Sequence, residues 1–313
     1  MEKADELIKG IESGNRLSLA RALSRIENRE VGVEELVSKL YRMGVGCDVW
    51  GVTGPPGAGK STLVDQMIKI FRKQGKTVAV IAVDPSSPFS GGAILGDRIR
   101  MQEHSGDKGV FIRSLGTRGK QGGLSQATRE VIMAFDAARF DVVLVETAGV
   151  GQTELDVLKM VMGVLVILVP ESGDSIQMMK AGLMEIADIF VVNKSDRPGA
   201  DNVIRALKNM LQLSHRQDLW SVPVIKAESI NGSGIDVVVK ALASYRTQLA
   251  DSAGMQLFRK KFVEGEILDI VQERVSSKTL QKISSQETEE LIQRVIDKKQ
   301  DPYSAADLIL PIK

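Results

Sequence analysis

The stretch that decides the fold runs Val49-Trp50-Gly51-Val52-Thr53 and then Gly54-Pro55-Pro56-Gly57-Ala58-Gly59-Lys60-Ser61. The apolar run predicts a buried strand, and the segment after it matches the pattern G-x-x-x-x-G-K-[ST]. Residues 62–72 then show helical spacing. Glycines let the backbone turn its N–H groups toward a phosphate, and the helix N-terminus adds positive potential there. We therefore expect a phosphate-binding loop (P-loop) at residues 54–61, with Thr62 also near the nucleotide.

Two side chains of this loop have predicted roles in chemistry. Lys60 is expected to reach the β- and γ-phosphate oxygens as a catalytic cation, and the Ser61 hydroxyl to bind Mg²⁺. The alternative is a glycine loop that matches by chance, which we estimate for roughly one chain in a hundred of this size from ordinary glycine content.

Short apolar runs alternate with helical segments along the middle of the chain, and this pattern predicts an α/β fold. Runs that are apolar almost throughout indicate a mostly parallel central sheet with helices on both faces, as in a P-loop NTPase. The runs are Val49–Thr53, Val78–Val83, Val110–Ile112, Val142–Val145, Val164–Val169, Ile189–Val192 and Val222–Ile225. Ligands of such sheets bind beyond the carboxyl ends of the strands.

Helical extensions are expected on either side of the sheet. We predict a helical N-terminal extension at 1–47, a P-loop domain at 48–250 and a helical arm at 251–313, because the apolar residues outside the middle recur at helical spacing. The arm has too little apolar mass to form a core alone, so it is expected to pack on something.

Composition argues against several classes of partner. The 313 residues include 41 basic and 40 acidic side chains, so neither nucleic acid nor an anionic membrane is expected as the principal partner. One cysteine and two histidines make a Cys/His metal site improbable. The apolar runs are shorter than the roughly 20 residues that a membrane helix needs. With no leader-like N-terminus, a cytoplasmic location is expected.

Carboxylates at strand ends suggest the rest of a magnesium site. Glu146 ends the run before Thr147-Ala148-Gly149, and Asp84 ends the run Val78–Val83. A carboxylate at the tip of a strand beside the P-loop can hold the hydration shell of Mg²⁺, and the N–H of Gly149 can turn toward a γ-phosphate. Asp97 lies farther along the connection after Asp84 and is a further candidate. A carboxylate that merely faces solvent is the alternative.

A second motif predicts which base is bound. Asn193-Lys194-Ser195-Asp196 has the form N-K-x-D and follows the run Ile189–Val192. Guanine presents an N1–H and an exocyclic amine side by side, and the Asp196 carboxylate can accept from both. Asn193 is expected to tie the loop to neighbouring backbone, with Lys194 across the base. Ser229, in the poorly matching stretch Lys226–Ser229, is the candidate for a second base-side loop.

Together these motifs resemble the MeaB/ArgK/MMAA family of GTPases. The segments that carry the resemblance are GVTGPPGAGKSTLVD, VDPSSPFSGGAILGDRIRM, FIRSLGTRG, VVLVETAGVGQTE, the N-K-S-D loop and the N-terminal NRLSLARALSRIENR. The resemblance implies a chaperone of adenosylcobalamin-dependent methylmalonyl-CoA mutase, or of a related acyl-CoA mutase, that gates cofactor loading and protects or reactivates the enzyme.

The resemblance also implies properties of the site and the assembly. It implies slow intrinsic hydrolysis of GTP to GDP, stimulation by the mutase, and a homodimer held by the C-terminal arm. Ser61, Asp84, Asp97 and Glu146 are expected to gather around Mg²⁺. The segment 174–180 is expected to be a switch that carries Gln177 and Lys180 as catalytic groups. Independently, Gln152 is a candidate to orient the attacking water.

Three other functions compete with this interpretation. A nickel-delivery GTPase usually carries many His or Cys ligands, which this chain lacks. A protein-targeting GTPase usually has a Met-rich groove, and Met160, Met162, Met178, Met179 and Met184 cluster here, although core packing of helices beside the run Val164–Val169 explains them better. A kinase of a transport protein would need a catalytic loop of His-Arg-Asp type, and none is present.

Overall fold

The structure is a computed structural model, and the described residues are 3–84, 102–104, 106–116, 123–149, 156–171, 183–213, 220–251, 253–283 and 286–310. Four predicted site residues lie outside these ranges: Asp97, Gln152, Gln177 and Lys180. For Asp84 only the backbone is described.

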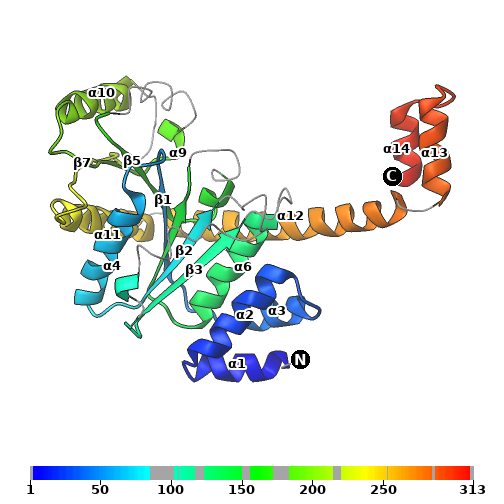
Figure 1. Ribbon diagram of the computed structural model, residues 1–313, viewed down its shortest axis with the longest axis horizontal. Coiled ribbons are helices and arrows are strands. Elements are labelled where there is room, and N and C mark those ends of the chain that lie inside the picture. The colour runs from blue at the N-terminus through cyan, green and yellow to red at the C-terminus, as the bar shows by residue number, and fades with distance from the viewer. Residues whose placement is uncertain are drawn as a thin grey trace. The chain divides into compact units, whose positions relative to one another are not determined.

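Seven parallel strands of the described residues form one sheet in the order β3-β2-β4-β1-β5-β6-β7 (Figure 1). Their bounds are β1 Asp48–Thr53, β2 Val78–Asp84, β3 Val110–Gly116, β4 Val142–Thr147, β5 Gly163–Leu168, β6 Ile189–Val192 and β7 Val224–Lys226. With helices on both faces of this sheet, the predicted fold class is confirmed.

Burial on both faces explains why the strands are apolar throughout. On one face, Val142 and Leu144 of β4 join a core with α4 (Lys60–Lys73) and α11 (Ile235–Asp251). The alternate residues Val143 and Val145 are also fully buried. On the other face lies α6 (Gly123–Ala137), whose Phe135 packs edge-on against Phe140 with ring centroids 5.4 Å apart. Since successive residues of a strand point to opposite faces, no position of β4 can be polar without a partner.

Three further helices of the described residues lie in the sheet region. These are the short η1 (Gln102–His104), α9 (Met184–Ile186) and α10 (Ala200–Leu213), the last of which packs near β6 and β7.

The N-terminal helices lie below the sheet in Figure 1, where the second and third pack against α6 and the first packs on those two. They are α1 (Ala4–Glu12), α2 (Arg16–Asn28) and α3 (Val33–Met43). Arg29 at the end of α2 forms an ion pair of 2.7 Å with Glu130 of α6. Asp136 of α6 accepts hydrogen bonds from the backbone N–H groups of Gly46 and Cys47, at 2.8 and 2.9 Å, so the connection to β1 is also fixed.

By internal contacts the chain divides into two compact units, Met1–Arg259 and Lys260–Lys313. The N-terminal helices therefore belong to the unit that contains the sheet. The long α12 (Gly254–Ile283) crosses the division, and α13 (Gln286–Ile296) and α14 (Pro302–Ile309) follow it. The three-part division at 47/48 and 250/251 stays a prediction.

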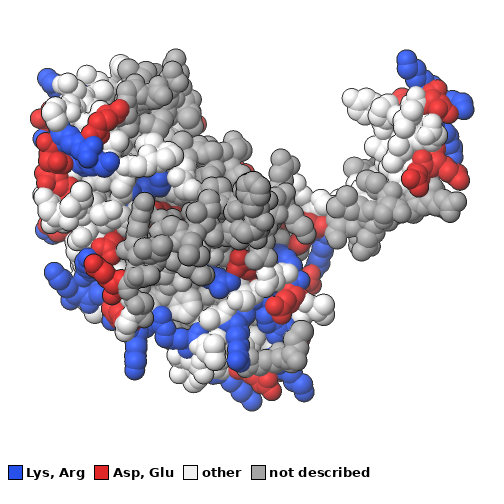
Figure 2. Space-filling model, viewed as in Figure 1, with Lys and Arg blue, Asp and Glu red and all other residues white. Residues whose placement is uncertain are grey.

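Three properties of the described residues bear on partners. Among the described residues, no helix combines the length and apolar character needed to cross a membrane. Basic and acidic side chains are interspersed over the described parts of the face drawn in Figure 2. On α12 the large apolar side chains Leu257, Ile267, Leu268, Val271 and Val275 are exposed.

Candidate nucleotide site

The P-loop has a backbone that only glycine allows at two of its positions. Gly54 has φ 151°, and a Cβ there would lie 2.2 Å from the carbonyl oxygen of Ile167. Gly59 has φ 88°, and a Cβ there would lie 2.4 Å from Nδ2 of Asn193. A side chain at either position would push the loop away from β5 or from the N-K-S-D loop. The glycine pattern of the sequence thus has a direct steric cause.

Lys60 is the first residue of α4 and its ammonium points back into the loop. Its Nζ donates hydrogen bonds to the carbonyl oxygens of Gly54, Pro55 and Ala148, at 3.0, 3.1 and 3.0 Å. The side chain is buried, so its charge acts in surroundings where electrostatic interactions are strong. Lys60 therefore places a positive charge between the P-loop and the residues that follow β4.

Ser61 and Glu146, both predicted ligands of Mg²⁺, lie in contact with each other. The Ser61 hydroxyl donates to Oε1 of Glu146 at 2.7 Å, and both side chains are buried. Beside them, Oγ1 of Thr53 donates to the carbonyl oxygen of Gly149 at 2.9 Å, and Oγ1 of Thr147 lies 2.9 Å from the same oxygen. The two threonines fix the position of Gly149 at the end of β4, a role that the sequence analysis missed.

The oxygen groups at this edge of the sheet suit magnesium. Mg²⁺ prefers hard oxygen ligands and usually keeps several waters while binding one or two carboxylates and the phosphates of a substrate. Ser61 and Glu146 supply a hydroxyl and a carboxylate, and the pairing of Val83 with Thr147 brings the end of β2, with Asp84, to the same edge. Within the described ranges no group of three or more His, Cys, Asp and Glu side chains could hold a metal ion. The donors fit a metal shared with phosphates rather than a site closed by protein.

The predicted base-side loop joins the P-loop through Asn193. Its Nδ2 donates to the carbonyl oxygen of Ala58 at 2.8 Å, and its Oδ1 accepts from the backbone N–H and the hydroxyl of Ser229, at 3.0 and 2.9 Å. The Lys194 ammonium donates to the carbonyl oxygen of Gly57 at 2.8 Å. Three segments that are far apart in the sequence thus meet at one buried amide.

Asp196 lies at the exposed end of the same loop, between Ser195 and Arg197, which both bond other segments of the protein. The backbone N–H of Ser195 donates to the carbonyl oxygen of Ala227 at 3.1 Å. Arg197 forms an ion pair with Glu171, which follows β5, and this hydrogen bond lowers the pKa of the Glu171 carboxyl. Ala227 is a further position that sequence reasoning missed, because its contact is made by backbone atoms.

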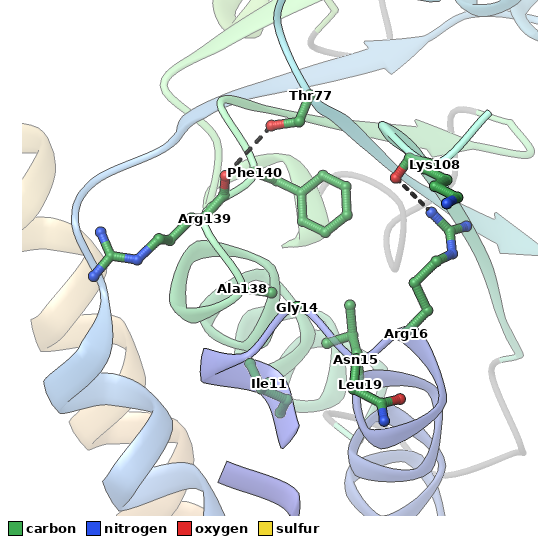
Figure 3. A pocket seen from close by; sticks show the side chains of 10 residues that line it. All are labelled: Ile11, Gly14, Asn15, Arg16, Leu19, Thr77, Lys108, Ala138, Arg139 and Phe140. Carbon is green, nitrogen blue, oxygen red and sulfur yellow. Dashed lines mark hydrogen bonds between the residues drawn. The ribbon is translucent and has the colours of Figure 1, made fainter. Parts of the chain in front are cut away.

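A separate pocket lies at the opposite end of the strands and is shown in Figure 3. Its volume is about 150 Å³, and its lining is Ile11, Gly14, Asn15, Arg16, Leu19, Thr77, Lys108, Ala138, Arg139 and Phe140. The Arg16 guanidinium donates to the carbonyl oxygens of Lys108 and Val110, at 2.8 and 2.7 Å. Asn15 caps α2 by accepting from the N–H groups of Leu17 and Ser18. The Arg16 guanidinium therefore holds the start of α2 against the amino end of β3.

The sheet order, the P-loop before α4 and the N-K-S-D loop after β6 define a P-loop nucleotide-binding protein. Comparison with known proteins agrees. Residues 19–284 match the family model described as "Methylmalonyl Co-A mutase-associated GTPase MeaB". The chain belongs to this family of P-loop GTPases.

Similarity to individual proteins extends over most of the chain. A protein from Pyrococcus abyssi is 47% identical over 98% of this chain and 95% of its own. GTPase ArgK of Escherichia coli is 38% identical over 82% of this chain and 80% of its own. The mouse protein named "Methylmalonic aciduria type A homolog, mitochondrial" is 32% identical over 98% of this chain and 78% of its own. A crystal structure named as that of a LAO/AO transport system kinase has a TM-score of 0.74 at 27% identity, covering 98% of this chain and 96% of that one.

Proposed function

We propose that the chain is a GTP-hydrolysing chaperone of an adenosylcobalamin-dependent acyl-CoA mutase, most simply methylmalonyl-CoA mutase. In this role it binds the mutase, gates the loading of its cofactor, and protects or reactivates the enzyme. The description of the family and the name of the mouse relative support the choice of partner. The GTPase part of this proposal is supported above all by the hydrogen bonds of the Asn193 amide, which join the P-loop to the base-side loop and to Ser229.

In the proposed mechanism each group of the phosphate side has one task. The N–H groups of residues 54–61 and the Lys60 ammonium hold the β- and γ-phosphates, with Gly149 facing the γ-phosphate. Ser61 and Glu146, together with Asp84 and Asp97, would hold Mg²⁺. When bound, the metal neutralises charge that develops on the phosphate oxygens.

On the base side, Asp196 accepts the paired donors of guanine, and Lys194 lies along the ring. This arrangement favours GTP and GDP over adenine nucleotides, because the wrong base leaves the carboxylate without its donors. Ser229 supports the loop by its two hydrogen bonds to Asn193.

Three further residues complete the proposal, and all lie outside the described ranges. Gln152 orients the attacking water. Gln177 and Lys180, in the segment after β5, act when the mutase selects a conformation that brings them to the nucleotide, where a cation stabilises the developing charge. The protein works in the cytoplasm as a homodimer, and the apolar side chains exposed on α12 are suited to such an interface.

The experiment is GTP turnover with and without saturating methylmalonyl-CoA mutase, for the natural chain and for Gln177→Ala and Lys180→Ala. We expect stimulation of the natural chain, and loss of most of that stimulation in both variants with the basal rate nearly unchanged. Equal loss in both conditions would show ordinary active-site residues. Absence of binding to any cobalamin-dependent mutase, together with binding of nickel or of signal peptides, would favour one of the competing GTPase functions instead.

A further inference from the structure

Two loops at the base side of the site lie against each other and are joined by an ion pair. They follow the neighbouring strands β5 and β6. A Cβ at Gly199, in the loop after β6, would lie 3.8 Å from Cβ of Pro170, which follows β5. The next residue, Glu171, forms the ion pair with Arg197 of the loop after β6. This pair therefore joins the chain beyond β5 to the loop that contains Asp196.

Arg197 has two carboxylates within electrostatic reach. Glu171 is the largest cause of the raised pKa of the Arg197 guanidinium, and the charge of Asp196 adds to it. Arg197 directly follows Asp196, in a turn closed by a hydrogen bond of 3.0 Å from the N–H of Arg197 to the carbonyl oxygen of Lys194. The side chains of Arg197 and Glu171 are 45% and 48% exposed. The guanidinium can therefore exchange one carboxylate for the other without moving a buried group.

The choice between these two carboxylates matters for the base. In the structure the guanidinium is bonded to Glu171, and the exposed Asp196 forms no ion pair with the described residues. Under the proposed function, the Asp196 carboxylate accepts from the N1–H and the exocyclic amine of guanine. A guanidinium can bind a carboxylate through two parallel hydrogen bonds, which use the same two oxygens. An Arg197 side chain that turned to Asp196 would therefore compete with the base.

We propose that Glu171 is a positioning residue, which holds Arg197 away from Asp196 and so keeps the base-reading carboxylate open to guanine. The proposal rests on the role given to Asp196 under Proposed function, and it adds a determinant of selectivity outside the N-K-S-D loop. Glu171 acts through Arg197. Loss of the Glu171 charge should therefore weaken the binding of guanine nucleotides and spare adenine nucleotides, which do not use the carboxylate.

The test is the affinity of the full chain for GDP and for ADP, measured by calorimetry for Glu171→Gln, Arg197→Ala and the double variant. Glu171→Gln keeps the size of the side chain and removes its charge. It should weaken GDP binding about 3- to 5-fold, within the range of an exposed ion pair, and change ADP binding by less than about 2-fold. Arg197→Ala and the double variant should bind GDP as the natural chain does, because no guanidinium remains to compete. Salt at about 1 M should narrow the difference between Glu171→Gln and the natural chain, since it screens exposed charges.

Asp201→Asn is the matched control. Asp201 of α10 forms an exposed ion pair of 2.6 Å with Lys226 of β7, and its loss releases a cation that is not in the loop of Asp196. This variant should keep the natural affinity for GDP.

Unchanged GDP affinity of Glu171→Gln would overturn the positioning role. A double variant that binds GDP as weakly as Glu171→Gln would overturn it too, since the ion pair would then only fasten the two loops together. A natural chain that does not prefer GDP to ADP would instead overturn the proposed base site. Glu171→Ala, measured alongside, should match Glu171→Gln, and it decides between these outcomes if the glutamine variant does not fold.

Discussion

The base side and the phosphate side of the nucleotide site are held together in different ways. On the base side, the Asn193 amide bonds the backbone of Ala58 and the backbone and hydroxyl of Ser229. On the phosphate side, the Lys60 ammonium and the Ser61 hydroxyl bond protein oxygens that phosphate and metal would replace. Under the proposed function, the bonds on the base side stay in place, whereas those on the phosphate side are exchanged when GTP binds. Changes on the base side should therefore alter selectivity and stability, and changes on the phosphate side should alter turnover.

The largest effect is expected at Lys60. Lys60→Ala should reduce GTP hydrolysis by about a thousand-fold or more with the fold intact, because the substitution removes the cation that the P-loop itself supplies to counter the γ-phosphate charge. Phosphate release measures the rate, and circular dichroism checks the fold. Lys73→Ala, which removes the same charge from the exposed end of α4, is the control and should turn over normally. Normal turnover of Lys60→Ala would remove the P-loop from the mechanism.

A smaller but more specific effect is expected at Asp196. Asp196→Asn should shift preference from GTP toward xanthosine triphosphate by about a hundred-fold, since an amide can donate to the additional oxygen of xanthine. Competition binding of the two triphosphates measures the ratio. Asp236→Asn, an exposed carboxylate that pairs only with its helical neighbour Lys240 in the interactions described, should keep the natural ratio. If Asp196→Asn also keeps the natural ratio of GTP to xanthosine triphosphate binding, another group reads the base.

Asn193 should show the smallest effect on activity and a clear effect on stability. Asn193→Ala leaves the hydroxyl of Ser229 and the carbonyl of Ala58 without this partner in a buried place, which costs about 2–3 kcal/mol. We expect about 10- to 100-fold weaker GDP binding and a lower melting temperature, by calorimetry. The exposed Asn202→Ala is the control, because its side chain bonds only Arg205 in the interactions described. Unchanged melting of Asn193→Ala would show that the base side does not depend on this amide.

The sequence was sufficient for the parts of the site that are local in the chain. The P-loop, the carboxylate at the end of β4 and the N-K-S-D loop follow from short patterns whose steric and electrostatic reasons can be stated without a structure. The bond from Asn193 to Ala58 was expected only as an unspecified backbone contact, because it joins groups 135 residues apart. Contacts that depend on strand register and helix placement are not revealed by any pattern in one sequence. Examples are the contacts of the Thr53 and Thr147 hydroxyls with the carbonyl oxygen of Gly149. The hydrogen bond between His104 and Asp65 is another.

Strand limits show the same dependence on distant partners. The apolar run predicted β3 to end at Ile112, but β3 continues to Gly116, paired in register with β2 as far as Asp84. Polar residues are tolerated there because Arg113 bonds Glu27 of α2. At β7, the strand is Val224–Lys226 instead of 222–225, since its partners are Phe190 to Val192 of β6.

The most direct test of the central claim compares phosphate release from GTP and from ATP by the natural chain at saturating Mg²⁺. The account predicts slow but measurable release from GTP, and at least about a hundred-fold less from ATP at equal low concentrations, because adenine cannot offer Asp196 its two donors. Equal release from both nucleotides, or release from neither, would contradict a GTP site built from the P-loop and the N-K-S-D loop.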